Sequence, residues 1–505
     1  MQPHLGYDNG GTCTLGSLLW FPDLAERIAA HLPPNEVPCG MRLVNKATAA
    51  LFSKEEHKIV DTCKPVPLGA FAERWGRGRA RELTLDGRRD LIRCTALSGD
   101  LPNLELATDA CGLLPPLDCW LAAAQNGHIH ICDWLKKRDR PFDKQRGAVA
   151  LAARHGHRQT CDWLLREAGY PWSEEAVCEG LRRGDLDLAN WLLQQRPAEP
   201  EAENDNNEHG GGRPELLGGV LAAAAHGFDL STFRRLLWEL LPDATPASEP
   251  SDGGNQATVP AALRALALRV GDEPLSEEDL GSVVAGAAGS KTSDWAAKME
   301  WLEAEGYPKT PEATEKAAAC KNSALQRLQW LRGRGYPLGE GAIKEAVSRG
   351  DMPALQYLLA EGAPSDVEAA DLAARNGRLA ALQVLHTTGR LVTAEGAAMH
   401  AAWGGHLPVL AWLVEESGLG VELHYDIFAQ ATQSGNVGML EWLHQRGCPT
   451  EPDGKKHWSA VDYAVAGGHE PSIEWLVERG CSIPVGAAVK GHAQGPVAGR
   501  GYLAG

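Results

Sequence analysis

The chain has 505 residues, of which 44% are hydrophobic and 23% are charged, a composition typical of a soluble folded protein. Its 49 Lys and Arg residues against 66 Asp and Glu residues give a formal net charge of −17. This argues against a general nucleic-acid binder, because phosphate neutralisation requires a basic surface. No run of 18 apolar residues occurs, so we expect no membrane-spanning helix.

The N-terminus and the cysteines favour an intracellular location. Asp8, Asp23 and Glu26 accompany only a short apolar patch, which fits neither a secretory signal nor an Arg-rich transit peptide. The 12 cysteines are scattered without a Cys-x-x-Cys pair, so we expect reduced thiols. The expected location is the cytoplasm or the nucleus.

Residues 17–58 are the first expected unit, a small helical module. Leu24, Ile28 and Leu32 recur at every fourth position and predict one apolar face of a helix, which Pro33 ends. Further apolar positions fit two more short helices: Val37, Leu43, Val44 and Leu51. A module of about 40 residues is marginally stable alone, which favours a partner surface.

This pattern resembles an F-box, whose outline is Leu-Pro-x-x-Leu, an Ile four residues on, Leu-Pro-Pro, and then Arg-Leu-Val-x-Lys. The matching residues are Phe21, Pro22, Leu24, Ile28, Leu32, Pro33, Pro34, Val37, Arg42, Leu43, Val44 and Lys46. The resemblance implies docking on the Skp-type subunit of a cullin-RING ubiquitin ligase. The docking residues it implies are Pro22, Leu24, Ile28, Leu32 and Val44. The alternative is an unrelated helical cap on the rest of the chain.

Residues 59–83 are expected to form a basic linker. Together with the start of the next unit they carry the main basic cluster: Arg74, Arg77, Arg79, Arg81, Arg88, Arg89 and Arg93. We interpret the cluster as a solvated linker that offsets the acidic remainder of the chain. An acidic partner or a nuclear address is the alternative.

An internal repeat occupies residues 84–483. The phrase Ala-Ala-x-x-Gly-His followed by Trp-Leu recurs, as at Ala123–Leu135 and Ala401–Leu413. The Trp, or the residue replacing it, is the anchor of each unit. Twelve anchors follow, most of them 27 to 33 residues apart: Leu106, Trp134, Trp163, Trp191, Leu236, Trp301, Trp330, Tyr357, Val384, Trp412, Trp442 and Trp475. In nine units a Gly stands seven residues before the anchor.

Each unit predicts two short helices. The first is Ala-rich, as at 147–154, and the Gly ends it because a residue without Cβ adopts the left-handed conformation at no cost. The second places apolar residues at helical spacing. One such hairpin cannot bury both faces, so neighbours must stack into a solenoid. The expected fold is therefore all-α, a helical-hairpin solenoid of about twelve units behind the small N-terminal module.

The repeat resembles the ankyrin repeat in a shortened form that carries Trp-Leu. It lacks the Thr-Pro-Leu-His opening, and most units are near 28 residues long instead of 33. Polar insertions near 197–214 and 242–260 are too poor in apolar residues to fold, so we expect them to be disordered. We expect residues 484–505 to form a flexible tail.

Candidate chemistry within the repeats is sparse. His128 with Cys132 and His157 with Cys161 have a spacing compatible with metal binding, but a hydrogen bond between equivalent repeats accounts for the histidines. Gly286–Thr292 resembles a phosphate loop that lacks the two required glycines. No nucleophile or metallohydrolase motif occurs. We therefore expect no catalytic residue, no metal and no cofactor.

The repeats predict a protein-binding surface. Eight of the 16 tryptophans are anchors, which marks those as structural. Aromatic residues outside the anchor position, Trp172, Trp403 and Trp458, are the candidates for partner contact. The favoured function is a substrate receptor of an SCF-type ubiquitin ligase whose ankyrin-like surface holds an unknown target protein. The alternatives are a plain ankyrin-repeat scaffold and a metal-dependent hydrolase carried on the repeats.

Overall fold

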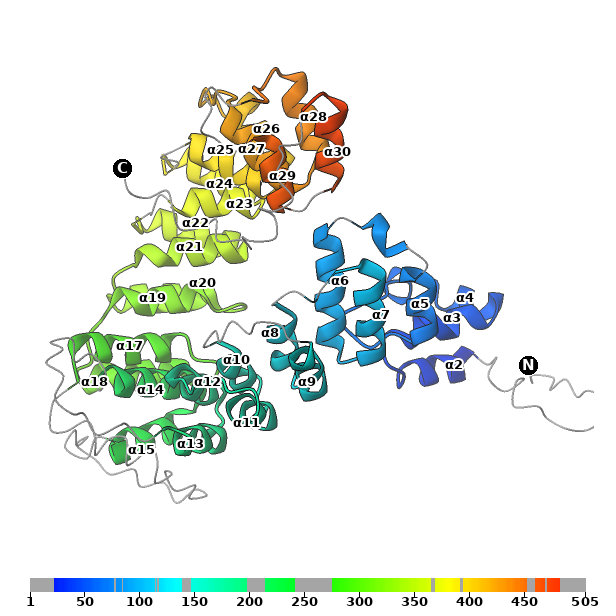
Figure 1. The fold of residues 1–505 in the computed structure, drawn as a ribbon. Helices are drawn as coiled ribbons and strands as arrows, with labels where there is room; N and C mark the ends of the chain where they lie inside the picture. Colours follow the sequence, from blue (N-terminus) through cyan, green and yellow to red (C-terminus); the bar gives the residue numbers. More distant parts are fainter. Residues whose placement is uncertain are drawn as a thin grey trace, which may run out of the picture. The chain divides into compact units, whose positions relative to one another are not determined.

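The computed structural model describes residues 22–76, 79–83, 85–113, 115, 118–138, 147–197, 214–240, 275–364, 368–390, 394–451, 459–467 and 470–481. Over these residues the protein has 28 α-helices and no strand, which confirms the expected all-α class (Figure 1). None of the described helices has the length and apolarity to cross a membrane. Nearly all of the two polar insertions, and the whole expected tail, lie outside the described residues.

The chain divides into two compact units. The described residues up to 83, together with 87–148 and 159–170, form the first unit, and 84–86, 149–158 and 171 onwards form the second. The first unit holds α2 (Pro22–Ala29), η1 (Val37–Met41), α3 (Arg42–Val44), α4 (Lys46–Leu51), η2 (Glu55–His57), α5 (Leu68–Trp75), η3 (Arg79–Glu82), most of α6 (Leu85–Ser98), α7 (Leu101–Cys111), α8 (Asp118–Gln125), α9 (Ile129–Lys137) and most of α11 (Arg158–Arg166).

The second unit holds most of α10 and all of the later helices. They are α10 (Gly147–Arg154), α12 (Glu174–Arg183), α13 (Leu186–Gln194), α14 (Pro214–Gly227), α15 (Leu230–Leu240), α17 (Glu277–Ala288), α18 (Trp295–Ala304), α19 (Pro311–Ala318), α20 (Ala324–Gly333), α21 (Glu340–Arg349), α22 (Met352–Ala360), α23 (Glu368–Arg375), α24 (Leu379–Thr387), α25 (Ala394–Trp403), α26 (Leu407–Ala411) with η4 (Trp412–Glu416), α27 (Tyr425–Ser434), α28 (Val437–Gln445), α29 (Ala460–Gly467) and α30 (Glu470–Glu478).

From α6 onwards the described helices form twelve pairs. Each predicted anchor lies in the second helix of a pair, from Leu106 in α7 to Trp475 in α30. Eight of the nine glycines that precede the anchors have φ between +68° and +88°, as expected for a left-handed helix end. The ninth, Gly468, lies outside the described residues.

The first helices of successive pairs pack against one another in the second unit. This holds for each step from α12 through α14, α17, α19, α21, α23, α25 and α27 to α29 (Figure 1). Small residues allow the close approach. In α23 all four alanines are buried at 2% exposure or less: Ala369, Ala370, Ala373 and Ala374. Between α14 and α17, a Cβ on Gly286 would lie 2.2 Å from the carbonyl oxygen of Ala222. Only glycine fits at that point.

The second helices bury the residue after the anchor, and in every pair except that of α15 this residue is less exposed than the anchor itself. In the eleven pairs from α8 to α30 this residue is Leu, at most 4% exposed: Leu135, Leu164, Leu192, Leu237, Leu302, Leu331, Leu358, Leu385, Leu413, Leu443 and Leu476. Three anchor tryptophans are buried, namely Trp191, Trp412 and Trp475, and the other five are half-buried. The tryptophans are structural, but most of them lie at the rim of the core.

An arginine four residues after the anchor covers the indole in four pairs. The guanidinium carbon lies 3.9 to 4.3 Å from the ring centre of Trp134, Trp330, Trp442 and Trp475. A cation over a half-exposed indole contributes about 0.5–1 kcal/mol. The fully buried Leu is therefore the main determinant of stability in each second helix.

We predict that Leu443→Ala destabilises the protein more than Trp442→Ala. The Leu443 side chain is fully buried, so its truncation leaves a cavity that costs about 2–5 kcal/mol. Trp442 is half-buried and loses part of its contacts and the Arg446 stacking only. Denaturant unfolding of the two variants measures the difference. A larger loss for Trp442→Ala would contradict this assignment of the core.

Candidate functional site

The N-terminal module has a core different from the expected one. Ala25 of α2, Val37 of η1 and Phe52 after α4 form its buried cluster, with Ala29, Met41 and Leu51 packed against it. The expected apolar face of Leu24, Ile28 and Leu32 is only half-buried. Because α2 ends at Ala29, Leu32 lies in the following turn and not on the helix, which corrects the expected four-residue stripe. The residue before a proline avoids the helical conformation, and Leu32 precedes Pro33.

The helix α3 presents two exposed apolar side chains. Leu43 is 73% exposed and Val44 is 63% exposed. Asn45 follows in extended conformation, with φ −165° and ψ 179°, and its Oδ1 accepts hydrogen bonds from the backbone N–H groups of Ala47 and Thr48. This capping box begins α4 as a separate helix after α3. Leu43 and Val44 are therefore left outside the module core.

Exposed apolar side chains are concentrated in one stretch of the chain. Among the described residues, six large apolar side chains are more than 40% exposed, and five of them lie between residues 43 and 68: Leu43, Val44, Ile59, Val60 and Leu68. The sixth is Val477 in α30. Contiguous exposed apolar surface is typical of protein interaction sites, whereas isolated residues are not.

The five predicted docking residues differ in accessibility. Pro22 is exposed, Leu24, Ile28 and Leu32 are half-buried, and Val44 is exposed. Sequence reasoning missed Leu43 as a contact residue, although it precedes Val44 in the same Arg-Leu-Val motif. Its exposure depends on the short length of α3, which the sequence pattern did not indicate.

The segment expected to be a solvated linker is folded onto the first unit. Asn35 is buried, and its Nδ2 donates to the carbonyl oxygens of Asp61 and Pro65 at 2.8 and 2.9 Å, while its Oδ1 accepts from the Asp61 N–H at 2.9 Å. Further on, Phe71 of α5 is 2% exposed, and α5 packs on α7. The segment therefore holds the module against the first helix pairs of this unit.

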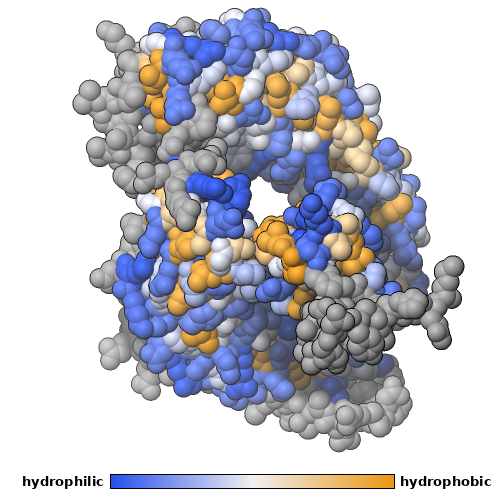
Figure 2. Space-filling model, turned by 90° about the vertical axis from the view of Figure 1, so that its right-hand side faces the viewer, coloured by the Kyte–Doolittle hydropathy of each residue, from blue (hydrophilic) through white to orange (hydrophobic). Residues whose placement is uncertain are grey.

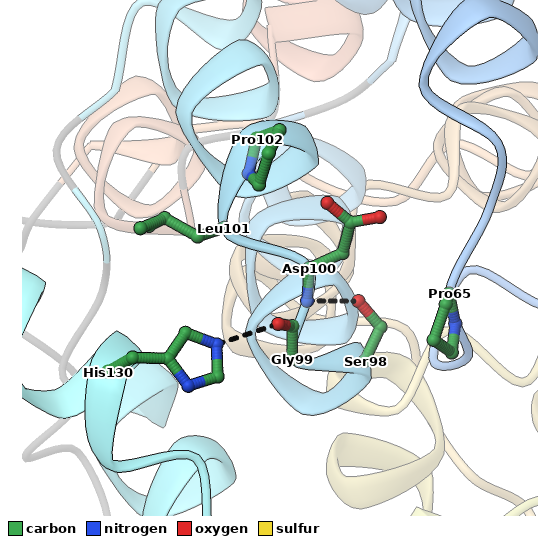
Figure 3. A pocket seen from close by; sticks show the side chains of 7 residues that line it. All are labelled: Pro65, Ser98, Gly99, Asp100, Leu101, Pro102 and His130. Carbon is green, nitrogen blue, oxygen red and sulfur yellow. Dashed lines mark hydrogen bonds between the residues drawn. The ribbon is translucent and has the colours of Figure 1, made fainter.

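A shallow depression of about 410 Å³ lies beside this segment (Figure 3). It is lined by Pro65, Ser98, Gly99, Asp100, Leu101, Pro102 and His130. Its polar groups stabilise the local fold: His130 Nε2 lies 2.8 Å from the Gly99 carbonyl oxygen, and Asp100 Oδ1 accepts from the Asn103 N–H at the start of α7. The described residues contain no group of three or more His, Cys, Asp or Glu side chains arranged to hold a metal ion.

Within the described residues, the histidines and cysteines with the metal-compatible spacing do not form metal sites, and their side chains have other roles. His128 Nε2 lies 3.0 Å from the carbonyl oxygen of Leu97 in the preceding pair, where a Cβ on Gly99 would lie 2.5 Å from the imidazole. Cys132 and Cys161 are fully buried, and burial raises the pKa of both thiols to about 12. A protonated buried thiol is a core residue and a poor metal ligand.

The two predicted contact tryptophans that the structure describes have partners of their own. The indole N–H of Trp172 donates to the Leu192 carbonyl oxygen at 2.7 Å, so this ring is anchored to α13. Trp403 is half-buried beside Arg375, whose guanidinium carbon lies 4.3 Å from the ring centre. Trp458 lies outside the described residues.

The segment that resembles a phosphate loop is a closed turn between α17 and α18. A phosphate cradle needs free backbone N–H groups. Here the backbone N–H of Ser290 donates to the Ala287 carbonyl oxygen, and that of Lys291 donates to the His226 carbonyl oxygen. The backbone N–H of Thr292 donates to the Ser290 hydroxyl. These donors are occupied within the protein.

Two buried cations donate hydrogen bonds to this turn and to the residues beside it. Lys298 is fully buried, and its Nζ donates to the carbonyl oxygens of Ala225 and Phe228 and to Ser290 Oγ at 2.6–2.9 Å. Arg327 donates to the carbonyl oxygens of Ala288 and Ser290 at 2.6 and 2.8 Å. Both cations stand three residues before an anchor, where other pairs have Val409 or Met439.

The surface of the protein is mixed in character where Figure 2 draws it. On the face drawn in Figure 2, hydrophobic side chains lie in small groups between hydrophilic ones. No protein-family model matches the chain, and no curated protein matches it. The function is therefore inferred from the residues themselves.

We predict that Lys298 makes stability depend on pH above 8. Burial lowers the pKa of Lys298 from its ordinary 10.5 to about 8. Between these values the unfolded chain keeps a proton that the folded protein has released, so rising pH favours the folded state. The unfolding free energy of the wild type, measured relative to that of Lys298→Met, should be flat below pH 8 and rise up to pH 10.5. A flat difference over that range would refute the lowered pKa.

Proposed function

We propose that this protein is an interaction adaptor, the substrate receptor of an SCF-type ubiquitin ligase. The N-terminal module, which resembles an F-box, docks on the Skp-type subunit. The helix pairs hold the target protein close to the ubiquitin-transferring enzyme. Catalysis is then proximity supplied to another enzyme, without covalent chemistry in this chain. Such an adaptor works in the cytoplasm or the nucleus.

The helix pairs are, in this proposal, a shortened ankyrin-like solenoid. The proposal is supported by the twelve pairs, by the glycines with positive φ before the anchors and by the stacking of first helices in the second unit. Stacked repeats present a long surface instead of a closed pocket, which suits protein recognition.

The exposure of Leu43 and Val44 is the observation that carries the docking role. If the module served only to cap the first helix pairs, its apolar motif residues would be expected in that contact. Instead the module has a core of its own, and these two side chains remain 73% and 63% exposed. Apolar side chains on a small module gain most from burial against a partner.

A plain scaffold is the second candidate function. Leu24, Ile28 and Leu32 are half-buried within the first unit, and Asn35 ties the module to residues 61–65. Both features suit a module that stabilises the start of the repeats. The two functions differ in whether α3 binds anything.

We predict that co-expression with a Skp-type adaptor captures the full chain in equimolar amount, and that Leu43→Asp/Val44→Asp reduces capture at least about tenfold. Two charges placed in a docking face must be desolvated on binding, which opposes association. Both side chains are exposed, so the variant keeps its fold. Affinity purification with quantified band intensities measures the effect.

The matched control is Val477→Asp, the same kind of change at the exposed apolar residue of α30. It should leave capture unchanged. Failure to capture the folded wild-type chain would favour the plain scaffold. Equal loss in both variants would contradict docking through α3.

A further inference from the structure

Four cations lie at the ends of three first helices of the second unit, α10, α12 and α17. Arg154 ends α10, Arg182 and Arg183 end α12, and Lys291 follows α17. We name these residues the turn-edge cluster. His155 and His226 lie in the same row of turns.

Contacts between neighbouring pairs hold the cluster together. Arg154 donates two hydrogen bonds to the Glu179 carboxylate at 2.8 and 3.0 Å, and Arg182 donates one to the same carboxylate at 2.7 Å. The guanidinium of Arg183 lies over the turn of the preceding pair, where a Cβ on Gly156 would be 2.5 Å from its Nε. The cluster is thus one surface built from several pairs.

The cluster has more positive than negative charge. Glu179 is buried and serves two arginines. Arg183 and Lys291 are exposed, and no carboxylate of the described chain forms an ion pair with either. Beneath the Lys291 turn lie the buried cations Arg327 and Lys298, and Lys298 Nζ is 3.9 Å from Asp294 Oδ1.

Nearby carboxylates are occupied by backbone groups. Asp185 Oδ1 accepts from the Leu188 N–H at 2.9 Å, and Asp229 Oδ1 accepts from the Thr232 N–H at 2.8 Å. Both therefore serve as caps at helix starts, where the helix dipole stabilises their charge. Within the described residues, neither carboxylate forms an ion pair with Arg183 or Lys291.

The positive charges of the cluster contribute to a lowered pKa at two imidazoles, those of His226 and His155. Burial, followed by Lys291 and Arg182, lowers the pKa of His226 to about 4. Burial, followed by Arg154 and Arg183, also lowers the pKa of His155. Cations from different pairs act on the same imidazole, so their fields overlap.

The helix dipole explains only part of this arrangement. A basic residue in the last turn of a helix is stabilised by the carbonyl end. That accounts for Arg154 and for both arginines of α12. It does not account for the unpaired Lys291 beyond the end of α17, in a chain of net charge −17.

We propose that the turn-edge cluster binds an Asp- and Glu-rich segment of a partner protein. Guanidinium groups pair with carboxylates through two parallel hydrogen bonds, which suits an extended acidic peptide crossing the row of turns. The acidic net charge of the chain disfavours a long polyanion such as nucleic acid. The inference rests on the proposed function, because it names the chemistry of the target that the repeats would hold.

The test is the binding of a labelled ten-residue Asp/Glu peptide to the full chain, followed by fluorescence anisotropy. Binding should weaken at least about tenfold in Arg183→Glu/Lys291→Glu and less in the milder Lys291→Gln. A peptide with Gln and Asn in place of the acids should not bind. Circular dichroism verifies that each variant keeps the helix content of the wild type.

The control Lys54→Glu/Lys58→Glu makes the same change in net charge at exposed positions of the first unit. It should bind the peptide like the wild type. Equal loss in both double variants would overturn the proposal, since it would mean unspecific attraction. Tighter binding of a single-stranded oligonucleotide of equal charge, lost in the same variant, would also overturn it in favour of nucleic acid. Adaptor capture is measured separately, so its failure and the failure of peptide binding are distinguishable.

Discussion

The small size of each helix pair is the constraint on which the structure depends. A pair of about 20 helical residues cannot cover its own apolar side chains, so its neighbours must cover them. The first helices of neighbouring pairs pack against one another, and in eleven pairs the Leu after the anchor is buried. Stability therefore comes from contacts between neighbouring pairs, and Gly286 shows how little room those contacts leave.

Function is expected where the chain departs from this pattern. In the N-terminal module, Leu43 and Val44 stay outside a core that is otherwise closed. In the second unit, Lys298 and Arg327 replace apolar core residues and fix a turn that carries an exposed cation. The first departure leaves apolar surface, and the second concentrates positive charge. In the proposed adaptor, each of these two surfaces would bind a different partner.

Much of the fold could be predicted from the sequence, because it follows from local patterns. Each anchor lies in a second helix, and the glycines before the anchors end the first helices. What could not be predicted depends on residues distant in the chain. Asn35 folds the segment 61–65 onto the module through bonds 26 to 30 residues apart, and Arg183 joins the turn of Gly156. Helix α2 ends before Leu32 because the residue before a proline disfavours the helical conformation. The four-residue spacing of the apolar residues did not indicate this earlier end.

Hydrogen–deuterium exchange of the full chain, with and without a Skp-type adaptor, tests the central claim most directly. The account predicts slower exchange in α2 to α4 and at residues 59–68, because these backbone groups become covered on docking. Exchange in α12 to α17 should not change, because in this account the target protein binds there and the adaptor does not. Slowed exchange in α12 to α17 alone, or no change at a saturating adaptor concentration, would contradict docking through the N-terminal module.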